Sequence, residues 1–321
     1  MRIVFMGSPE FALPTLRRLI ESEHEIVGIF TQPDRPAGRG RKVAPPPVKT
    51  LALEHGLAVF QPRSISKPDV VEQLRTLAPD LGVIAAYGQI LRQPVLDVPR
   101  LGVLNVHASL LPRWRGAAPV PAAILAGDDH SGATIMLVRL ALDAGPMLWR
   151  AEIRIAPDDT AGTLTEKIAH TGADALIDVL PKWKAQSIEP IEQDESKATY
   201  APMIKKEHAL IRWERDDADA IARQVRAYNP WPMAWSYLDG EPLRMVEVVA
   251  LQHRFGAPPG TVFTFTGVDE APLFGAGFGV TTRDRDLAVT RVQPAGRPIM
   301  PASAYFNGHR HIIGKRLTAD R

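Results

Sequence analysis

The sequence contains no cysteine among its 321 residues. Disulfide bonds, thiolate catalysis and cysteine-ligated metals are therefore excluded. No apolar run approaches the roughly 20 residues that a membrane-spanning helix needs, and the apolar run at the N-terminus is too short for a signal peptide. We therefore expect a cytoplasmic protein. Its apolar and charged fractions, 45% and 23%, are typical of a globular chain long enough for two domains.

Three motifs of common enzyme classes are also missing. The first apolar run leads into MGSPEFA, which has a single glycine, so no dinucleotide-binding turn of the form G-x-G-x-x-G is expected there. No G-x-S-x-G occurs, so Ser109 is not a hydrolase nucleophile. The polar stretch GDDHSG at 127–132 lacks the helical spacing of a metal site, and we interpret it as a turn. We predict no bound metal.

The formal net charge is only +2, but basic residues gather in two places. The segment 31–50 holds one acidic residue, Asp34, against the basic residues Arg35, Arg39, Arg41, Lys42 and Lys49. The tail 291–321 holds Asp320 against Arg291, Arg297, Arg310, Lys315, Arg316 and Arg321. Two basic patches on a nearly neutral body suggest a polyanionic partner that is contacted at defined places. Solvated surface charge is the alternative for either patch taken alone.

The first half of the chain alternates between two hydrophobic periods. Short β-branched apolar runs bounded by turn residues predict buried strands at 2–7, 25–32, 81–88 and 101–108. Helical patterns with proline near their starts lie between them, at 9–22, 48–55 and 68–78. This alternation predicts an α/β fold with a doubly wound, mostly parallel sheet, in which ligands bind beyond the carboxyl ends of the strands.

The second half of the chain does not continue the alternation of strands and helices. A helix at 160–185 still belongs to the first domain, and the polar, aperiodic stretch 186–206 resembles a linker. Another helix ends at Asn229-Pro230, and short strand-like runs separated by turns then predict a small antiparallel barrel. We therefore predict domains at 1–188 and 207–321, joined by a linker at 189–206.

One strand carries polar side chains where it ends. In LNVHASLLPRWRGAAP, residues 104–119, Asn105 and His107 share one face of the strand, while Leu104 and Val106 share the other. An amide beside an imidazole suits a developing oxyanion. A structural polar pair at a sheet end is an equally good interpretation of this spacing alone.

A second strand candidate, ATIMLVRLAL at 133–142, leads to Asp143 in a turn sequence. A carboxylate beside a histidine orients the ring and favours its cationic form. Asn105, His107 and Asp143 together would form an acyl-transfer site without a covalent nucleophile. Asp143 considered alone is more simply a turn residue.

Several motifs, in order, resemble the formyltransferases that use 10-formyltetrahydrofolate. They are GSPEFA, TQPDRPAGRGRK, AAYGQIL, NVHASLLPRWRGAAP, LDAGPM, NPWPMAW and QPAGRPIM. Within that family the likeness is to members that formylate initiator methionyl-tRNA. The resemblance implies a Rossmann-like domain, a C-terminal barrel of OB type that binds tRNA, and a monomer. It implies catalysis by Asn105, His107 and Asp143, without a metal.

The resemblance also implies binding roles. Folate contacts fall on Ser109, Leu110, Leu111 and Pro112, and tRNA contacts on Arg35, Arg39, Arg41 and Lys42. The segment leading to Asp143 departs from the family pattern, because Arg139 and Ala141 stand where an acidic residue and a glycine are common. The approach of Asp143 to the site is therefore a question for the structure, as are the partners of Arg113 and Arg115.

Three other functions fit parts of this pattern. A formyltransferase acting on an amino sugar nucleotide would share the catalytic core, although a small acceptor needs no basic loop such as RPAGRGRK. A formyltetrahydrofolate hydrolase would use water in place of the amine. A non-enzymatic RNA-binding protein with an OB barrel would not need Asn105, His107 and Asp143 together.

Overall fold

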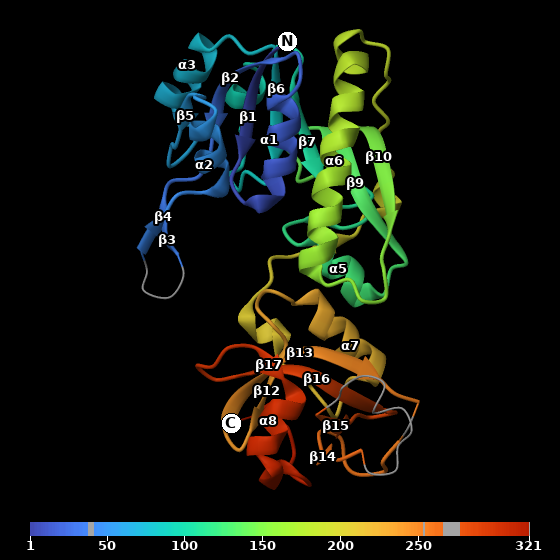
Figure 1. The fold of residues 1–321 in the computed structure, drawn as a ribbon. Coiled ribbons are helices and arrows are strands. Elements are labelled where there is room, and N and C mark those ends of the chain that lie inside the picture. Colours follow the sequence, from blue (N-terminus) through green and yellow to red (C-terminus); the bar gives the residue numbers. More distant parts are fainter. Residues whose placement is uncertain (38–41, 253, 266–276, 321) are drawn as a thin grey trace. The chain divides into compact units, whose positions relative to one another are not determined.

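The computed structural model describes residues 1–37, 42–252, 254–265 and 277–320 (Figure 1). The chain forms two compact units. The N-terminal unit comprises Met1–Pro119, Asp129–Arg154 and Leu164–Pro202, and the C-terminal unit comprises Val120–Asp128, Ile155–Thr163 and Met203–Arg321. Among the described helices, none is long and apolar enough to cross a membrane.

A seven-stranded sheet forms the centre of the N-terminal unit. Its strand order is β10-β9-β7-β6-β1-β2-β5. The strands are β1 (Arg2–Gly7), β2 (Glu25–Phe30), β5 (Val59–Phe60), β6 (Leu81–Ala85), β7 (Val103–His107), β9 (His130–Leu137) and β10 (Met147–Arg154). The five strands from β5 to β7 are parallel, whereas β9 runs antiparallel to β7 and β10 antiparallel to β9. The chain order reverses between β1 and β6, the position where doubly wound sheets bind ligands.

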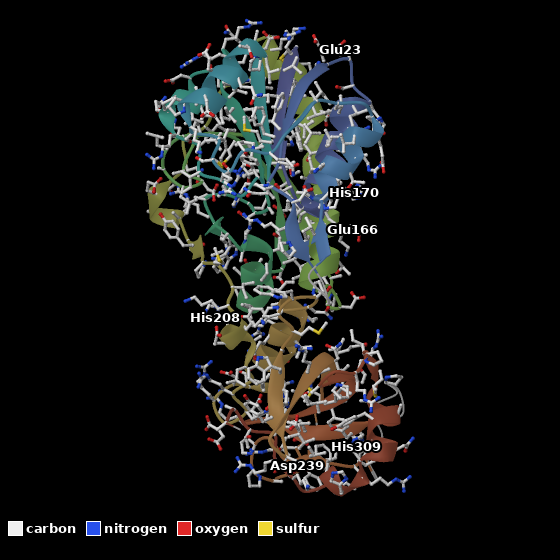
Figure 2. The ribbon with its side chains drawn as sticks, turned by 90° about the vertical axis from the view of Figure 1, so that its left-hand side faces the viewer. Glu23, Glu166, His170, His208, Asp239 and His309 are labelled. Atoms are coloured by element: carbon white, nitrogen blue, oxygen red, sulfur yellow. The ribbon has the colours of Figure 1, made fainter. Side chains whose placement is uncertain are left out.

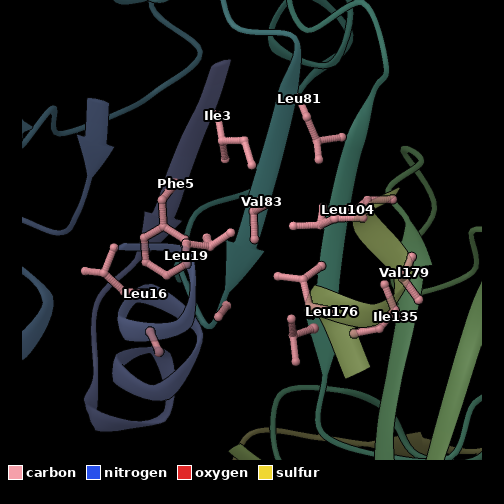
Figure 3. Packing of buried hydrophobic residues seen from close by; sticks show 14 of the residues in the cluster. Ile3, Phe5, Leu16, Leu19, Leu81, Val83, Leu104, Ile135, Leu176 and Val179 are labelled. Atoms are coloured by element: carbon pink, nitrogen blue, oxygen red, sulfur yellow. The ribbon is translucent and has the colours of Figure 1, made fainter. Parts of the chain in front are cut away.

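Helices cover both faces of this sheet. They are α1 (Leu13–Ile20), α2 (Pro47–Glu54), α3 (Pro68–Thr76), α4 (Gln93–Leu96) and α6 (Ala161–Lys184). On one face, side chains of α1, α2 and α6 pack with Phe5, Leu104 and Val106 (Figure 3). On the other face, α3 and α4 pack with Val4 and Val103. Because side chains alternate along a strand, Asn105 and His107 lie on the face that Val103 occupies.

The C-terminal unit contains an antiparallel sheet with the order β12-β13-β16-β15-β14 and β17 paired to β16. Its elements are α7 (Ala218–Ala227), β12 (Trp235–Leu238), β13 (Glu241–Ala250), β14 (Val262–Phe263), β15 (Phe278–Thr281), β16 (Asp286–Pro294), β17 (Met300–Pro301) and α8 (Ala302–Gly308). Asp239 and Gly240 both have positive φ, 53° and 77°, as a tight hairpin turn requires. Buried side chains of α7 and the strands form one core. The predicted fold class, a mostly parallel Rossmann-like sheet with a C-terminal antiparallel β domain, is confirmed.

The remaining elements are short. They are β3 (Arg35–Ala37), β4 (Lys42–Ala44), β8 (Arg115–Gly116), β11 (Tyr200–Ala201) and α5 (Pro119–Ala126), with 3-10 turns at Glu10–Ala12, Glu195–Lys197, Lys206–Ala209 and Arg310–Ile312. The polar stretch at 127–132, interpreted as a turn, contributes its last three residues to β9. The stretch resembling a linker contains β11, which pairs with β8 of the N-terminal unit.

Asp284 holds the start of α7 in the C-terminal unit. Its carboxylate accepts hydrogen bonds from the Ala218 amide and the Thr282 hydroxyl, each at 2.9 Å. Burial raises the pKa of Asp284, but these bonds, together with those from Arg285, outweigh burial and bring the pKa to about 2, below the ordinary 3.8. The ionised form therefore favours the folded state.

We expect Asp284→Ala to lower the unfolding temperature of the protein at neutral pH. The difference from the wild type should persist above the ordinary pKa of 3.8 and shrink as the pH falls through about 2, because both proteins then lack the charge. Thermal unfolding across this range, with the exposed Asp320→Ala as control, checks the expectation. A difference independent of pH would contradict the role of the charge.

Candidate active site

His107, at the end of β7, is the centre of the candidate site. Its side chain is only 6% exposed, and its Nε2 lies 3.0 Å from the carbonyl oxygen of Trp114. Asn105, two residues earlier on the same face of β7, is half-buried. Among the described residues, no side chain or backbone group is hydrogen-bonded to the Asn105 amide. That amide is therefore available to donate to a bound molecule.

Asp143 reaches His107 by an indirect path. Strand β9 is antiparallel to β7, with Thr134 opposite His107 and Leu137 opposite Leu104. The strand therefore ends level with the start of β7, away from His107. Yet the Asp143 Oδ2 atom lies 3.7 Å from His107 Nδ1. The loop 138–146 must consequently turn back along β7, which answers how Asp143 approaches the site.

The two ring nitrogens of His107 face two oxygen atoms. Nε2 faces the Trp114 carbonyl and Nδ1 faces the Asp143 carboxylate. The Nε2 distance is that of a hydrogen bond, whereas the Nδ1 distance of 3.7 Å makes the carboxylate a charged neighbour of the ring. Asp143 is fixed in turn by the Gly116 amide, which donates to its Oδ2 at 2.9 Å. The site thus places an imidazole and a carboxylate beside an amide that has no hydrogen-bond partner among the described residues.

The predicted folate-contact residues form a tight loop after β7. The Ser109 hydroxyl donates to the Arg113 carbonyl at 2.6 Å. The Thr134 hydroxyl donates to the Ser109 carbonyl at 2.7 Å and accepts from the Leu111 amide at 3.0 Å. Ser109 and Leu111 are buried, whereas Leu110 and Pro112 are half-buried. The first two thus shape the loop, and the folate contacts of all four stay predictions.

Arg115 points into the protein. Its side chain is 1% exposed and forms two bonds to the Glu195 carboxylate, at 2.8 and 2.9 Å. The guanidinium lowers the pKa of Glu195. Its Nε donates to the Gln193 amide oxygen at 3.0 Å. Arg113, by contrast, lies over the Trp114 ring at 4.3 Å.

Three residues that hold this site were not identified from the sequence: Thr134, Gln193 and Thr199. The Gln193 amide donates to the carbonyls of Asp143 and Gly145, at 2.8 and 2.7 Å. The Thr199 hydroxyl accepts from the Trp114 amide at 2.9 Å. Gln193 and Thr199 belong to the polar stretch interpreted as a linker, where their composition gives no local signal. Arg139 and Ala141 are the two residues that differ from the family pattern. Arg139 forms an exposed ion pair with Glu192 at 2.9 Å, and Ala141 is exposed.

The basic segment begins on an anchored hairpin. Strands β3 and β4 pair in antiparallel fashion, and Arg35 donates to the Gln32 amide oxygen at 3.0 Å. Before β3, Asp34 accepts bonds from Gln61 and Lys49 at 2.7 and 2.8 Å, and these bonds lower its pKa. Arg39 and Arg41 lie outside the described residues. Lys42 begins β4, but its side chain is not among those described.

The basic tail of the C-terminal unit is partly paired. Lys315 contacts Asp239 at 2.6 Å and Arg316 contacts Glu214 at 2.8 Å. A groove of about 630 Å³ is lined by side chains that include Asp239 and His309, both labelled in Figure 2. Within the described ranges, no three His, Asp or Glu side chains converge as metal ligands would.

Comparisons with known proteins cover almost the whole chain. Residues 1–180 match the family model of the formyl transferase, and residues 203–310 match that of the formyl transferase C-terminal domain. The methionyl-tRNA formyltransferase of Methylococcus capsulatus is 50% identical over 99% of both chains. That of Chloroflexus aurantiacus is 46% identical over 96% of this chain and 97% of its own.

Solved structures share the fold at low identity. The sugar 3N-formyl transferase WlaRD has a TM-score of 0.66 at 15% identity, covering 93% of this chain and 99% of its own. HypX from Aquifex aeolicus, solved with tetrahydrofolic acid, has a TM-score of 0.64 at 18% identity, covering 95% of this chain and 47% of its own. These likenesses support the fold.

Gly145 makes the return of the loop sterically possible. A Cβ atom at this position would lie 1.8 Å from the Leu137 carbonyl oxygen, so any other residue forces the backbone to move. We expect Gly145→Ala to lower the free energy of unfolding by about 1–3 kcal/mol, as overpacking does. Denaturant unfolding measures this. Gly308→Ala, where a Cβ meets no atom within 4 Å, is the control, and equal losses would contradict the steric argument.

Proposed function

Because this chain belongs to the formyl transferase family, we propose that it transfers the formyl group of 10-formyltetrahydrofolate to the amino group of initiator methionyl-tRNA. The family models match its two parts over residues 1–180 and 203–310. The observation that carries the proposal is the site itself. The Asn105 amide, with no partner among the described residues, lies on the same strand face as His107, whose Nδ1 is 3.7 Å from Asp143.

The chemistry needs donors for an oxyanion and a route for one proton. The α-amino nitrogen of the methionyl ester attacks the formyl carbon, a carbon–nitrogen bond forms, and negative charge develops on the formyl oxygen. Asn105 donates to that oxygen, and an imidazolium at His107, whose two ring nitrogens face the Trp114 carbonyl and Asp143, stabilises its negative charge. The bond from the formyl carbon to the folate nitrogen then breaks. Asp143 holds His107 and assists the transfer of the proton from the attacking nitrogen to the departing one.

The edge of the sheet suits a flat, partly apolar co-substrate. Ile90, in the loop after β6, is 85% exposed, and Leu140 and Leu142, in the loop that returns Asp143, are each 63% exposed. Large apolar side chains this exposed in the loops around a site offer surface to a ligand. We infer that the folate ring system packs against part of this exposed apolar surface, with Leu110 and Pro112 as further half-buried contacts.

The basic residues of the β3–β4 hairpin support the proposal that the formyl acceptor is an RNA. Its base is fixed at the carboxyl end of β2 by Asp34 and Gln32, and the sequence between its strands adds Arg39 and Arg41. Arginine recognises phosphates and guanine edges with paired donors. We infer that the segment with Arg35, Arg39, Arg41 and Lys42 binds the tRNA and that the protein acts as a monomer.

Product analysis tests the function. The protein is incubated with 10-formyltetrahydrofolate and, in separate reactions, with charged initiator tRNA, a nucleotide-linked amino sugar, or no acceptor. Formylmethionyl-tRNA as the product supports the proposal. A formylated sugar, or release of formate at the same rate without acceptor, would instead indicate the sugar enzyme or the hydrolase. Size-exclusion chromatography with light scattering checks the monomer.

We expect Asn105→Ala to lower kcat by about 10²–10³-fold, the usual loss when one oxyanion donor is removed. The fold should survive, because the Asn105 side chain is only half-buried and has no hydrogen-bond partner among the described residues. Steady-state kinetics and circular dichroism provide the measurement, with the exposed Asn307→Ala in α8 as control. Activity within a few-fold of wild type would remove Asn105 from the mechanism.

The proposed role of the β3–β4 hairpin in tRNA binding can be tested separately. Replacing Arg39, Arg41 and Lys42 with alanine should weaken tRNA binding and flatten its dependence on salt, since each lost phosphate contact removes counterion release. Folate affinity should not change. Filter binding at several salt concentrations measures the slope, and Lys67→Ala, an exposed lysine before α3, is the control. An unchanged slope would mean that this hairpin does not bind the tRNA.

A further inference from the structure

The stretch between the two family models is not a free connection. Residues 191–201, which we call the strap, fall between the matches at 1–180 and 203–310. They lie within the N-terminal unit, which continues to Pro202. The strap bonds to two separate segments of that unit, and these are the segments that carry the partners of His107.

The first segment is 112–117, which follows the loop after β7. The Arg115 amide donates to the Thr199 carbonyl at 2.8 Å, and the Ala117 amide donates to the Ala201 carbonyl at 2.9 Å. The Trp114 amide donates to the Thr199 hydroxyl. This segment supplies the Trp114 carbonyl to His107 and the Gly116 amide to Asp143. The strap therefore fixes both backbone groups.

The second segment is 143–147, at the end of the returning loop. Met147 and Ile191 exchange two backbone bonds of 2.8 Å. Gln193, which is 8% exposed, donates to the carbonyls of Asp143 and Gly145. Asp143 itself has a φ of 48°, a conformation that needs support from its surroundings.

Gln193 touches both segments at once. Its amide nitrogen holds Asp143 and Gly145, and its amide oxygen accepts from Arg115 Nε. Arg115 is held in turn by Glu195, two residues further along the strap. Without the Gln193 amide, the buried Gly145 carbonyl, the part-buried Asp143 carbonyl and the buried Arg115 Nε–H would lose these partners. The backbone at Asp143 would then have to shift to reach other partners.

We propose that the strap positions Asp143 against His107, and that Gln193 is a positioning residue for formyl transfer. This inference rests on the proposed function of the site. Gln193 touches neither the reacting atoms nor the catalytic side chains. It acts through the backbone of Asp143, whose carboxylate lies 3.7 Å from His107 Nδ1. A misplacement of about 1 Å in such a group can cost about 10²-fold in rate.

The test is Gln193→Met, which keeps the length of the side chain and removes its polar atoms. We expect kcat to fall about 10–100-fold, with KM for folate and for tRNA changed by less than about threefold. The same substitution in an Asp143→Ala background should cost little more, because residues that act through one group are not additive. An additive loss, or an unchanged kcat in the single variant, would overturn the proposal.

A matched control removes a similar interaction elsewhere. Gln224, in α7, is 9% exposed and donates to the carbonyls of His208 and Leu210. Gln224→Ala should lower the unfolding temperature as the Gln193 change does, while kcat stays near that of the wild type. If both variants lose kcat in proportion to their stability, Gln193 has only a structural role and the proposal fails.

Hydrogen exchange gives a readout that needs no activity. The Gly116 amide is held by the Asp143 carboxylate, so its exchange reports whether Asp143 is in place. We expect faster exchange at Gly116 in Gln193→Met and no change in Gln224→Ala. Unchanged exchange at Gly116 in Gln193→Met would overturn the inference. A wild type that fails to formylate tRNA would overturn the proposed function and leave this readout standing.

Discussion

The loop that carries Asp143 runs in the direction opposite to β9, the strand that precedes it. Strand β9 ends level with Leu104, yet the Asp143 carboxylate lies 3.7 Å from His107 Nδ1. Gly145 permits the close approach to Leu137, and Asp143 adopts a positive φ. The hydrogen bonds around His107 depend on this return of the loop. The Gly116 amide donates to the Asp143 carboxylate, and the Trp114 carbonyl contacts the His107 ring.

The buried guanidinium of Arg115 is bonded to the strap, which also holds the loop carrying Asp143. Arg115 is almost fully buried. A buried charge without partners destabilises the fold, so Arg115 needs hydrogen-bond partners. Glu195 and Gln193 provide them. The same Gln193 also satisfies carbonyls of the returning loop. The burial of Arg115 and the position of the Asp143 backbone are therefore coupled through one side chain.

The sequence predicted the parts of the molecule that have local signals. β1 agrees with the predicted residues 2–7, and the face shared by Asn105 and His107 followed from alternation along β7. It missed β10, an edge strand whose outer half alternates exposed and half-buried residues. It also missed Gln193, whose bonds join residues about fifty positions away. Contacts of that kind arise only when the chain has folded, and no composition or period marks them.

The strap changes where the chain can be divided. A boundary placed at residue 188, or where the first family match ends at 180, would leave the seven-stranded sheet complete. It would also assign the strap to the second part, although its bonds are to the first. In a chimaera that takes its residues 203–321 from a relative, the junction after Pro202 retains the chain's own strap. A junction before Ile191 imports a foreign one, so the exchange would also change the side chain that hydrogen-bonds to the Asp143 and Gly145 carbonyls.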